Sequence, residues 1–193
     1  TKSKIVLAME TAWALADVLH RLNIPTEVIG FTTYWDGAVK KASRDIIITD
    51  EDKRTYDRFA PINMPIFKQF DESFGTPQKK RIAGWKEIEL ADNIDGESIR
   101  KAADRLLRRP EPGKAMFVLS DGEPACMGME NELMEHHLKK VTRDVERQGI
   151  NLLGIGIGTD APERYYRKSV ILKDIEELPK TVVREITKVL LAK

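Results

Sequence analysis

The sequence has little of what usually reveals a function class. It holds one cysteine, Cys126, which excludes an intramolecular disulfide, and it shows no signal peptide. No stretch approaches the roughly 20 consecutive apolar residues of a membrane-spanning helix. The 32 basic and 31 acidic side chains leave a net charge of +1, which gives no long-range attraction to nucleic acid or to an anionic membrane. These absences favour a cytoplasmic protein whose partners are neither nucleic acids nor membranes.

Phosphate-binding glycine patterns are also missing. The sequence contains no Gly-x-x-x-x-Gly-Lys-[Ser/Thr] loop, so nothing in it predicts ATP hydrolysis by this chain. The glycines of "GIGIG" (residues 154–158) alternate within an apolar run instead of opening a helix, which does not fit the dinucleotide-binding pattern. We interpret them as positions where a strand packs closely against a neighbouring helix.

What is present suits one globular domain over residues 1–193, because 41% of the residues are hydrophobic and the length allows a sizeable core. Residues 34–90 show a weak signal and are expected to form an irregular insertion. Elsewhere, apolar periodicity predicts helices and strands in alternation, which indicates an α/β fold with a doubly wound, mostly parallel sheet. The expected helices are residues 1–24, 95–108, 129–149 and 175–193, and the expected strands are residues 25–33, 114–120, 150–158 and 168–174.

The run "KAMFVLSDGEP" (residues 114–124) ends an apolar strand on a carboxylate. Consecutive apolar residues are typical of a strand that helices cover on both faces. Such sheets place their ligands at the carboxyl ends of the strands, so Asp121 is expected at this rim, where Gly122 and Pro124 turn the chain away. A rim carboxylate beside hydroxyl groups suits a hard cation such as Mg²⁺. The alternative is that Asp121 only caps a turn or the following helix.

Two other clusters have both a structural and a functional interpretation. His136 and His137 are adjacent and would point about 100° apart on a helix, so they cannot share one metal ion, and a half-buried helix face is the simpler interpretation. The segment "RYYRK" (residues 164–168) pairs aromatic with basic groups, as single-stranded nucleic-acid sites do. With a net charge of +1, it is better interpreted as a surface whose Tyr and Arg side chains contact another subunit.

Six blocks of the sequence together resemble the von Willebrand factor A (VWA) domain of the cobaltochelatase CobT subunit. They are "GFTT" (30–33), "NIDGESI" (93–99), "RLLRRPEPGKAMFVLSDGEP" (105–124), "ELMEHHLKKV" (132–141), "LLGIGIGTD" (152–160) and "RYYRKSVILKDIEELP" (164–179). The resemblance implies a VWA-type sheet whose first strand would precede Thr1 and is absent from this chain. The loss of that strand implies either an upstream segment or pairing with a second copy in a homo-oligomer.

The resemblance also implies a metal-ion-dependent adhesion site, formed by three loops at the top of the sheet. The third loop corresponds to Ser120, Asp121 and Gly122, with Asp121 as a metal ligand and Ser120 at the rim. The second loop corresponds to "DNIDGE" (residues 92–97), where Asp95 is the expected ligand. The first loop, Asp-x-Ser-x-Ser, has no counterpart here. Mg²⁺ is therefore expected to bind weakly or not at all.

A function follows from the same resemblance. CobT-like subunits work beside a AAA+ ATPase subunit, and the pair drives cobalt insertion into a corrin ring held by a large third subunit. The VWA domain is then a non-catalytic adaptor whose bound cation gates docking. One alternative is an adaptor of a MoxR-like AAA+ ATPase unrelated to cobalamin synthesis, because a fold does not determine a function. Another is a metal-dependent hydrolase that uses Asp121 and Asp95.

Overall fold

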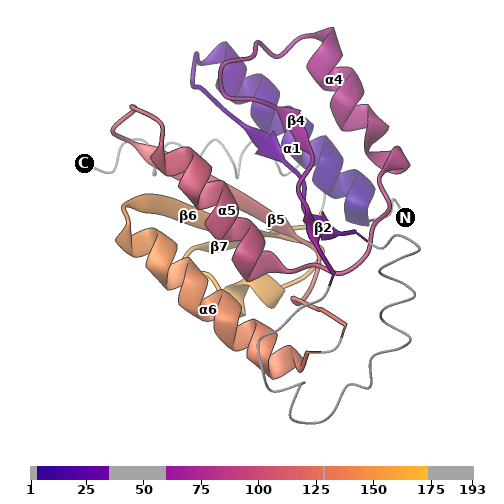
Figure 1. Cartoon of the computed structure of the whole chain (residues 1–193). Helices are drawn as coiled ribbons and strands as arrows, with labels where there is room; N and C mark the ends of the chain where they lie inside the picture. Colours follow the sequence, from indigo (N-terminus) through magenta and orange to yellow (C-terminus); the bar gives the residue numbers. More distant parts are fainter. Residues whose placement is uncertain (1–3, 35–59, 128, 174–193) are drawn as a thin grey trace.

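A computed structural model describes residues 4–34, 60–127 and 129–173 (Figure 1), and the helix predicted at residues 175–193 lies outside them. The helices are α1 (Lys4–Arg21), α4 (Thr76–Ala83), α5 (Asp95–Leu107) and α6 (Asn131–Arg147), with 3-10 helices η1 (Gly84–Glu87) and η2 (Ala161–Arg164). The strands are β1 (Val28–Ile29), β2 (Thr32–Thr33), β3 (Ile62–Asn63), β4 (Ile66–Lys68), β5 (Lys114–Ser120), β6 (Ile150–Ile157) and β7 (Ser169–Leu172).

Strands β5, β6 and β7 form a parallel sheet with β6 in its centre. The register of β5 against β6 runs from the pair Lys114–Ile150 to the pair Ser120–Gly156, and β7 joins the opposite edge of β6. The three strands predicted in this part of the chain, and their parallel direction, are confirmed. The fold is therefore α/β, while the doubly wound arrangement stays a prediction.

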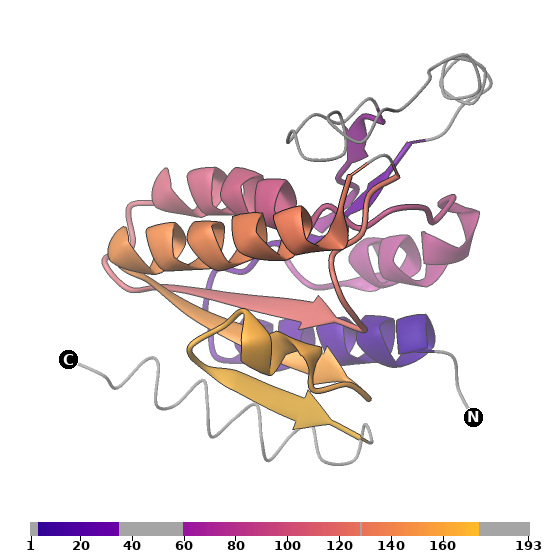
Figure 2. The same ribbon diagram turned by 90° about the horizontal axis from the view of Figure 1, so that it is seen from below.

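Helices cover both faces of this sheet (Figure 2). On one face, α5 and α6 pack against side chains such as Val118 and Leu152. On the other face, α1 packs through Leu15 and Leu19 against Leu153 and its neighbours. Because successive residues of a strand point to opposite faces, the uninterrupted apolar runs of β5 and β6 supply both layers of the core.

Burial differs from the sequence-based expectation in two places. In β5 only Val118 and Ser120 are buried, whereas seven of the eight residues of β6 are buried. The reason is that β5 is an edge strand of the described sheet and β6 is its centre. Leu22, which the apolar periodicity of residues 1–24 places on the buried face of the predicted helix, is 58% exposed, because α1 ends at Arg21 and Leu22 follows it.

The segment predicted as one strand over residues 25–33 instead forms two strands of two residues each. Strand β1 pairs antiparallel with β4, and β2 pairs antiparallel with β3. Gly30 separates β1 from β2 at a point where a Cβ atom would lie 2.9 Å from the ring of Phe67. The irregular insertion predicted at residues 34–90 is also corrected, because its described part carries β3, β4 and α4. Residues 35–59 lie outside the described part of the chain.

The ends of two helices follow the sequence. Helix α6 is followed by Gly149, whose φ of 86° lies in the left-handed region that glycine adopts readily. Helix α5 ends at Leu107, shortly before Pro110, which cannot continue a helix. Among the described helices, none combines the length and the apolar character needed to cross a membrane.

Candidate functional site

Strand β5 ends at Ser120, and the following turn places Asp121 on the surface at the carboxyl end of the sheet. The Ser120 hydroxyl donates a hydrogen bond to the carbonyl of Gly122 (3.0 Å), and the backbone N–H of Gly122 donates to the Ser120 oxygen (3.4 Å). The ammonium of Lys4, from the first turn of α1, donates to the backbone carbonyl of Asp121 at 2.8 Å. The Asp121 carboxylate is thus presented to solvent, while the Ser120 hydroxyl is engaged within its own turn.

Asp95 is the first residue of α5 and is 1% exposed. The carboxylate lies near the positive end of the helix dipole, which favours its negative charge. Burial nevertheless raises the pKa of Asp95 to about 7, and the nearby charge of Asp121 acts in the same direction. The side-chain amide of Asn93, which donates to Asp95 Oδ2 at 3.2 Å, partly opposes this shift. The structure therefore brings together the two predicted ligands, one buried and one exposed.

Asn93 also connects the segment before α5 to the loop after β5. Its amide nitrogen donates to the backbone carbonyl of Glu123 at 2.8 Å. Its backbone forms a two-way bridge with Ala125, in which both N···O distances are 3.1 Å. We call the bridged segments, residues 91–95 and 120–125, the rim. These hydrogen bonds hold the two rim segments side by side.

Three residues that support the rim were missed by the sequence analysis. The hydroxyl of Thr32 accepts a hydrogen bond from the N–H of Ala91 (2.8 Å), and that of Thr33 accepts from the N–H of Asp92 (3.1 Å). The carboxylate of Asp92 in turn accepts from the N–H of Met127 (3.1 Å). The two threonines at the end of "GFTT" could have indicated this support, because the hydroxyl group of a buried threonine is normally hydrogen-bonded.

Tyr166 packs behind the rim. It is 5% exposed, and its hydroxyl has no hydrogen-bond partner within the described residues. Burial raises the pKa of Tyr166 well above its usual value, and the charge of Asp95 adds to this. The ring fits because β6 carries Gly154 there, where a Cβ would lie 2.5 Å from Tyr166 Cδ2. Close packing at "GIGIG" is confirmed, although the neighbour is the segment at η2 and not a long helix.

The tyrosines of "RYYRK" are not the surface anchors that the sequence analysis expected, whereas contact of its exposed Arg side chains with another subunit stays a prediction. Tyr165 and Tyr166 are 6% and 5% exposed, so their rings belong to the core. His136 and His137 behave as expected for an ordinary helix face. His136 is exposed, whereas His137 packs so closely on α5 that a Cβ on Gly96 would lie 2.4 Å from its Nδ1 atom.

The side chains at the rim offer carboxylate oxygens, which are ligand atoms that Mg²⁺ prefers. The rim carries two carboxylates, Asp95 and Asp121, and the charge of Asp121 acts on Asp95. Mg²⁺ is commonly held by one or two carboxylates with water in the remaining positions. The described residues contain no group of three or more His, Cys, Asp or Glu side chains that could hold a metal ion. The rim therefore supplies a small oxygen-ligand set and not a complete protein cage.

Comparisons with known proteins add to this geometry. The family described as "Cobalamin biosynthesis protein CobT VWA domain" matches residues 1–192. A curated relative, "Uncharacterized protein YojO" of Bacillus subtilis (strain 168), is 28% identical over 108 residues. That match covers 51% of this chain and only 17% of the relative. No solved structure matches the chain.

Proposed function

Because the chain belongs to the family of CobT VWA domains, which ties it to cobalamin biosynthesis, we propose that it is a non-catalytic adaptor of an ATP-dependent cobaltochelatase. In this proposal Asp95 and Asp121 contribute to a weak Mg²⁺ site at the rim, the rim docks onto a AAA+ ATPase, and the assembly inserts cobalt into a corrin ring held by a large subunit. The observation that carries the proposal is the pairing of exposed Asp121 with buried Asp95 at the carboxyl end of β5.

The two carboxylates have different tasks in this proposal. Asp95 is held in place by α5 and by the amide of Asn93, so it anchors the cation from below. Asp121 lies at the surface, so it holds the cation where a partner can reach it. Bound there, Mg²⁺ would supply coordination positions that an oxygen ligand of the partner can enter. Lys4 keeps a positive charge beside the loop and so favours an acidic partner group.

In this proposal the partner, and not this chain, hydrolyses the ATP that drives the reaction. The sequence has no Gly-x-x-x-x-Gly-Lys-[Ser/Thr] loop, and the proposed adaptor therefore relies on a separate ATPase. An adaptor role also fits the exposure of Asp121 at the carboxyl end of the sheet, where parallel α/β sheets usually bind their ligands.

The test is an affinity pull-down with the natural full-length protein, in Mg²⁺ and in chelator, with bound proteins identified by mass spectrometry. Asp121→Asn removes the charge with little change in shape, and Asp160→Asn is the matched control because Asp160 is an exposed aspartate that follows the next strand, β6. We expect a AAA+ ATPase to be recovered in Mg²⁺, and to be lost in chelator and with Asp121→Asn but not with Asp160→Asn.

Recovery of a large corrin-binding subunit in the same sample would support the cobaltochelatase. A AAA+ ATPase without it would indicate the alternative, an adaptor of a MoxR-like ATPase. Recovery that is independent of both Mg²⁺ and Asp121 would show that the loop after β5 is only a turn, and would contradict the proposed docking.

A further inference from the structure

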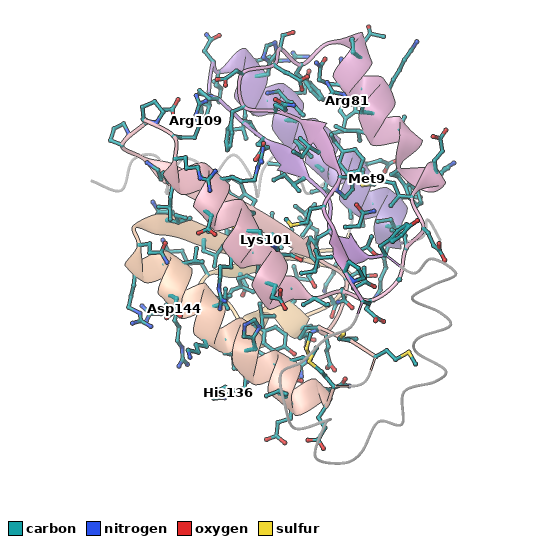
Figure 3. All side chains as sticks on the ribbon, in the orientation of Figure 1. Met9, Arg81, Lys101, Arg109, His136 and Asp144 are labelled. Atoms are coloured by element: carbon teal, nitrogen blue, oxygen red, sulfur yellow. The ribbon has the colours of Figure 1, made fainter. Side chains whose placement is uncertain are left out.

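The outer face of α6 is strongly basic. His136, Lys140, Arg143 and Arg147 are all exposed and recur at a spacing of four, three and four residues, which aligns them along one side of the helix. The opposite side of α6 is buried in the core through Met134, Leu138, Val141 and Val145. The orientation of the basic stripe toward solvent is thus fixed by packing. Figure 3 labels His136 and Asp144 toward the two ends of this helix.

Two adjoining hollows, each of about 320 Å³, run along this face. The first lies among the long side chains of α6, from His136 to Arg147. The second lies between α6 and the segment 164–167. Both are lined by Lys139 and Arg143, so they lie next to each other. We call the combined surface the basic groove.

The buried Tyr165 ring lines the second hollow and contacts two of the groove cations. The Tyr165 ring lies beneath Lys139 Nζ, at 5.7 Å, and beneath the guanidinium carbon of Arg164, at 5.3 Å, both measured to the ring centroid. The hydroxyl of Thr142 donates to the Tyr165 carbonyl at 2.9 Å, which ties this segment to α6. Cation–π contacts of this kind hold the two charged groups over the ring.

The charges of the basic groove do not balance. Its six cations meet only four carboxylates, Glu123, Glu135, Asp144 and Glu146, which pair with Lys139, Arg147, Arg164 and Arg167. Among the residues that the structure describes, Lys140 and Arg143 are the two groove cations without an ion pair. The excess of two positive charges is therefore located at these two positions.

We propose that the basic groove is a docking site for an acidic segment of a partner protein, with two of its carboxylates on Lys140 and Arg143. Side chains three residues apart on a helix have Cβ atoms about 5–6 Å apart. Alternate residues of an extended peptide lie on one side at roughly 6–7 Å, so acidic residues at every second position match the two cations.

A peptide suits the basic groove better than a nucleic acid. The four carboxylates already present lie beside the groove cations and would repel an unbroken phosphate chain, which carries a charge about every 3.4 Å along one strand. A peptide can space its carboxylates to meet Lys140 and Arg143 and place uncharged residues elsewhere. This docking site is separate from the rim, and its binding does not depend on Mg²⁺.

The test uses a fluorescent 12-residue peptide of alternating Glu and Ser, with a Gln–Ser peptide as the neutral control. Binding to the full chain is measured by fluorescence anisotropy in chelator at about 50 mM NaCl, where charge screening is limited. The double variant Lys140→Glu/Arg143→Glu should weaken binding at least about tenfold, because attraction becomes repulsion at both contacts.

The matched control is Lys101→Glu/Arg108→Glu, which makes the same change in net charge at one exposed position of α5 and at the exposed residue that follows the helix; Figure 3 labels Lys101. It should change the dissociation constant by less than about twofold, because neither Lys101 nor Arg108 lines the basic groove. Far-UV circular dichroism of both variants should match that of the unaltered chain. Amide chemical shifts in the NMR spectrum should change on α6 and near Tyr165 when the Glu–Ser peptide is added.

Several results would overturn the proposal. An equal loss of binding in the α5 variant would show attraction to overall charge and not to a site. If the Gln–Ser peptide bound equally well, the carboxylates of the Glu–Ser peptide would not be what the groove binds. If the amide chemical shifts changed only on another face of the protein, Lys140 and Arg143 would not be the binding residues. Tighter binding of a single-stranded oligonucleotide of the same charge would identify the basic groove as a phosphate surface instead. Asp121→Asn should leave peptide binding unchanged, which keeps this test independent of the proposed cation docking.

Discussion

The rim and the basic groove both carry charged side chains, but the rim buries one of them, whereas the basic groove exposes them to solvent. At the rim, Asp95 is 1% exposed, and the hydroxyls of Thr32 and Thr33 hold the backbone around it. In the basic groove, Lys140 and Arg143 extend into solvent from a helix whose opposite side is buried. The charge of Asp95 is therefore coupled to the folding of the domain, whereas the charges of Lys140 and Arg143 are available to a partner.

The difference follows from solvation. A buried carboxylate loses its hydration and must gain a proton, a hydrogen bond or a cation in return, which is why the pKa of Asp95 is raised. An exposed ammonium or guanidinium keeps its water and contributes little to stability. Substitutions at the two surfaces should accordingly separate into effects on folding and effects on binding.

The largest expected effect concerns Asp95 and pH. The pKa of Asp95 is about 7 in the folded chain and near 3.8 in the unfolded chain, so the folded chain keeps this proton up to a higher pH. Stability from this group is present at low pH and is lost as the pH rises from about 4 to about 7, by up to about 4 kcal/mol. Urea unfolding in chelator should show this loss in the unaltered chain relative to Asp95→Asn. A difference between the two that is constant across this range would contradict the prediction.

The second effect tests how tightly the rim is packed. Gly156 pairs with Ser120 across β5 and β6, and a Cβ there would lie 2.1 Å from the carbonyl oxygen of Thr159. Gly156→Ala must therefore move the backbone and should lower the free energy of unfolding by about 3 kcal/mol. Gly113→Ala is the control, because no atom lies within 4 Å of its added Cβ. Equal stability of the two variants in thermal or urea unfolding would refute this packing argument.

The smallest effect is expected in the basic groove. Lys140→Ala/Arg143→Ala removes two exposed cations that have no ion pair among the described residues, so the free energy of unfolding should change by less than about 0.5 kcal/mol. The same variant should bind the Glu–Ser peptide more weakly. A loss of stability comparable to that of Gly156→Ala would mean that these side chains support the fold, and the contrast between the two surfaces would disappear.

Local patterns predicted the parts of the fold that depend on neighbours in sequence. The strand before Asp121, the helix after Asn93 and the glycine after α6 all follow from periodicity and from residues that end helices. The exposure of Leu22 and the burial of Tyr165 were not predicted, since each depends on where the rest of the chain lies. Helical periodicity placed Leu22 on a buried face, and the pairing of Tyr with Arg placed Tyr165 at the surface; both predictions were wrong.

Buried polar groups were the hardest to predict. Lys68 is 2% exposed, and its ammonium donates to the carbonyls of Thr26 (2.7 Å) and Gln69 (3.0 Å). Burial lowers the pKa of Lys68, while nearby acidic groups oppose the change. Nothing in the sequence around this lysine distinguishes it from the many exposed ones, because its partners are backbone carbonyls brought close by folding.

The sequence by itself determined the alternation of helices and strands, the parallel strands β5 to β7 and the carboxylate at the end of β5. These features depend on apolar periodicity and on turn residues, which act over a few neighbouring positions. Tertiary structure alone decided that Asp95 is buried beside exposed Asp121, that β1 and β2 pair antiparallel with β4 and β3, and that α6 and residues 164–167 share one basic groove. Each of these joins segments that are distant in sequence, and burial and electrostatic interactions depend on distance in space.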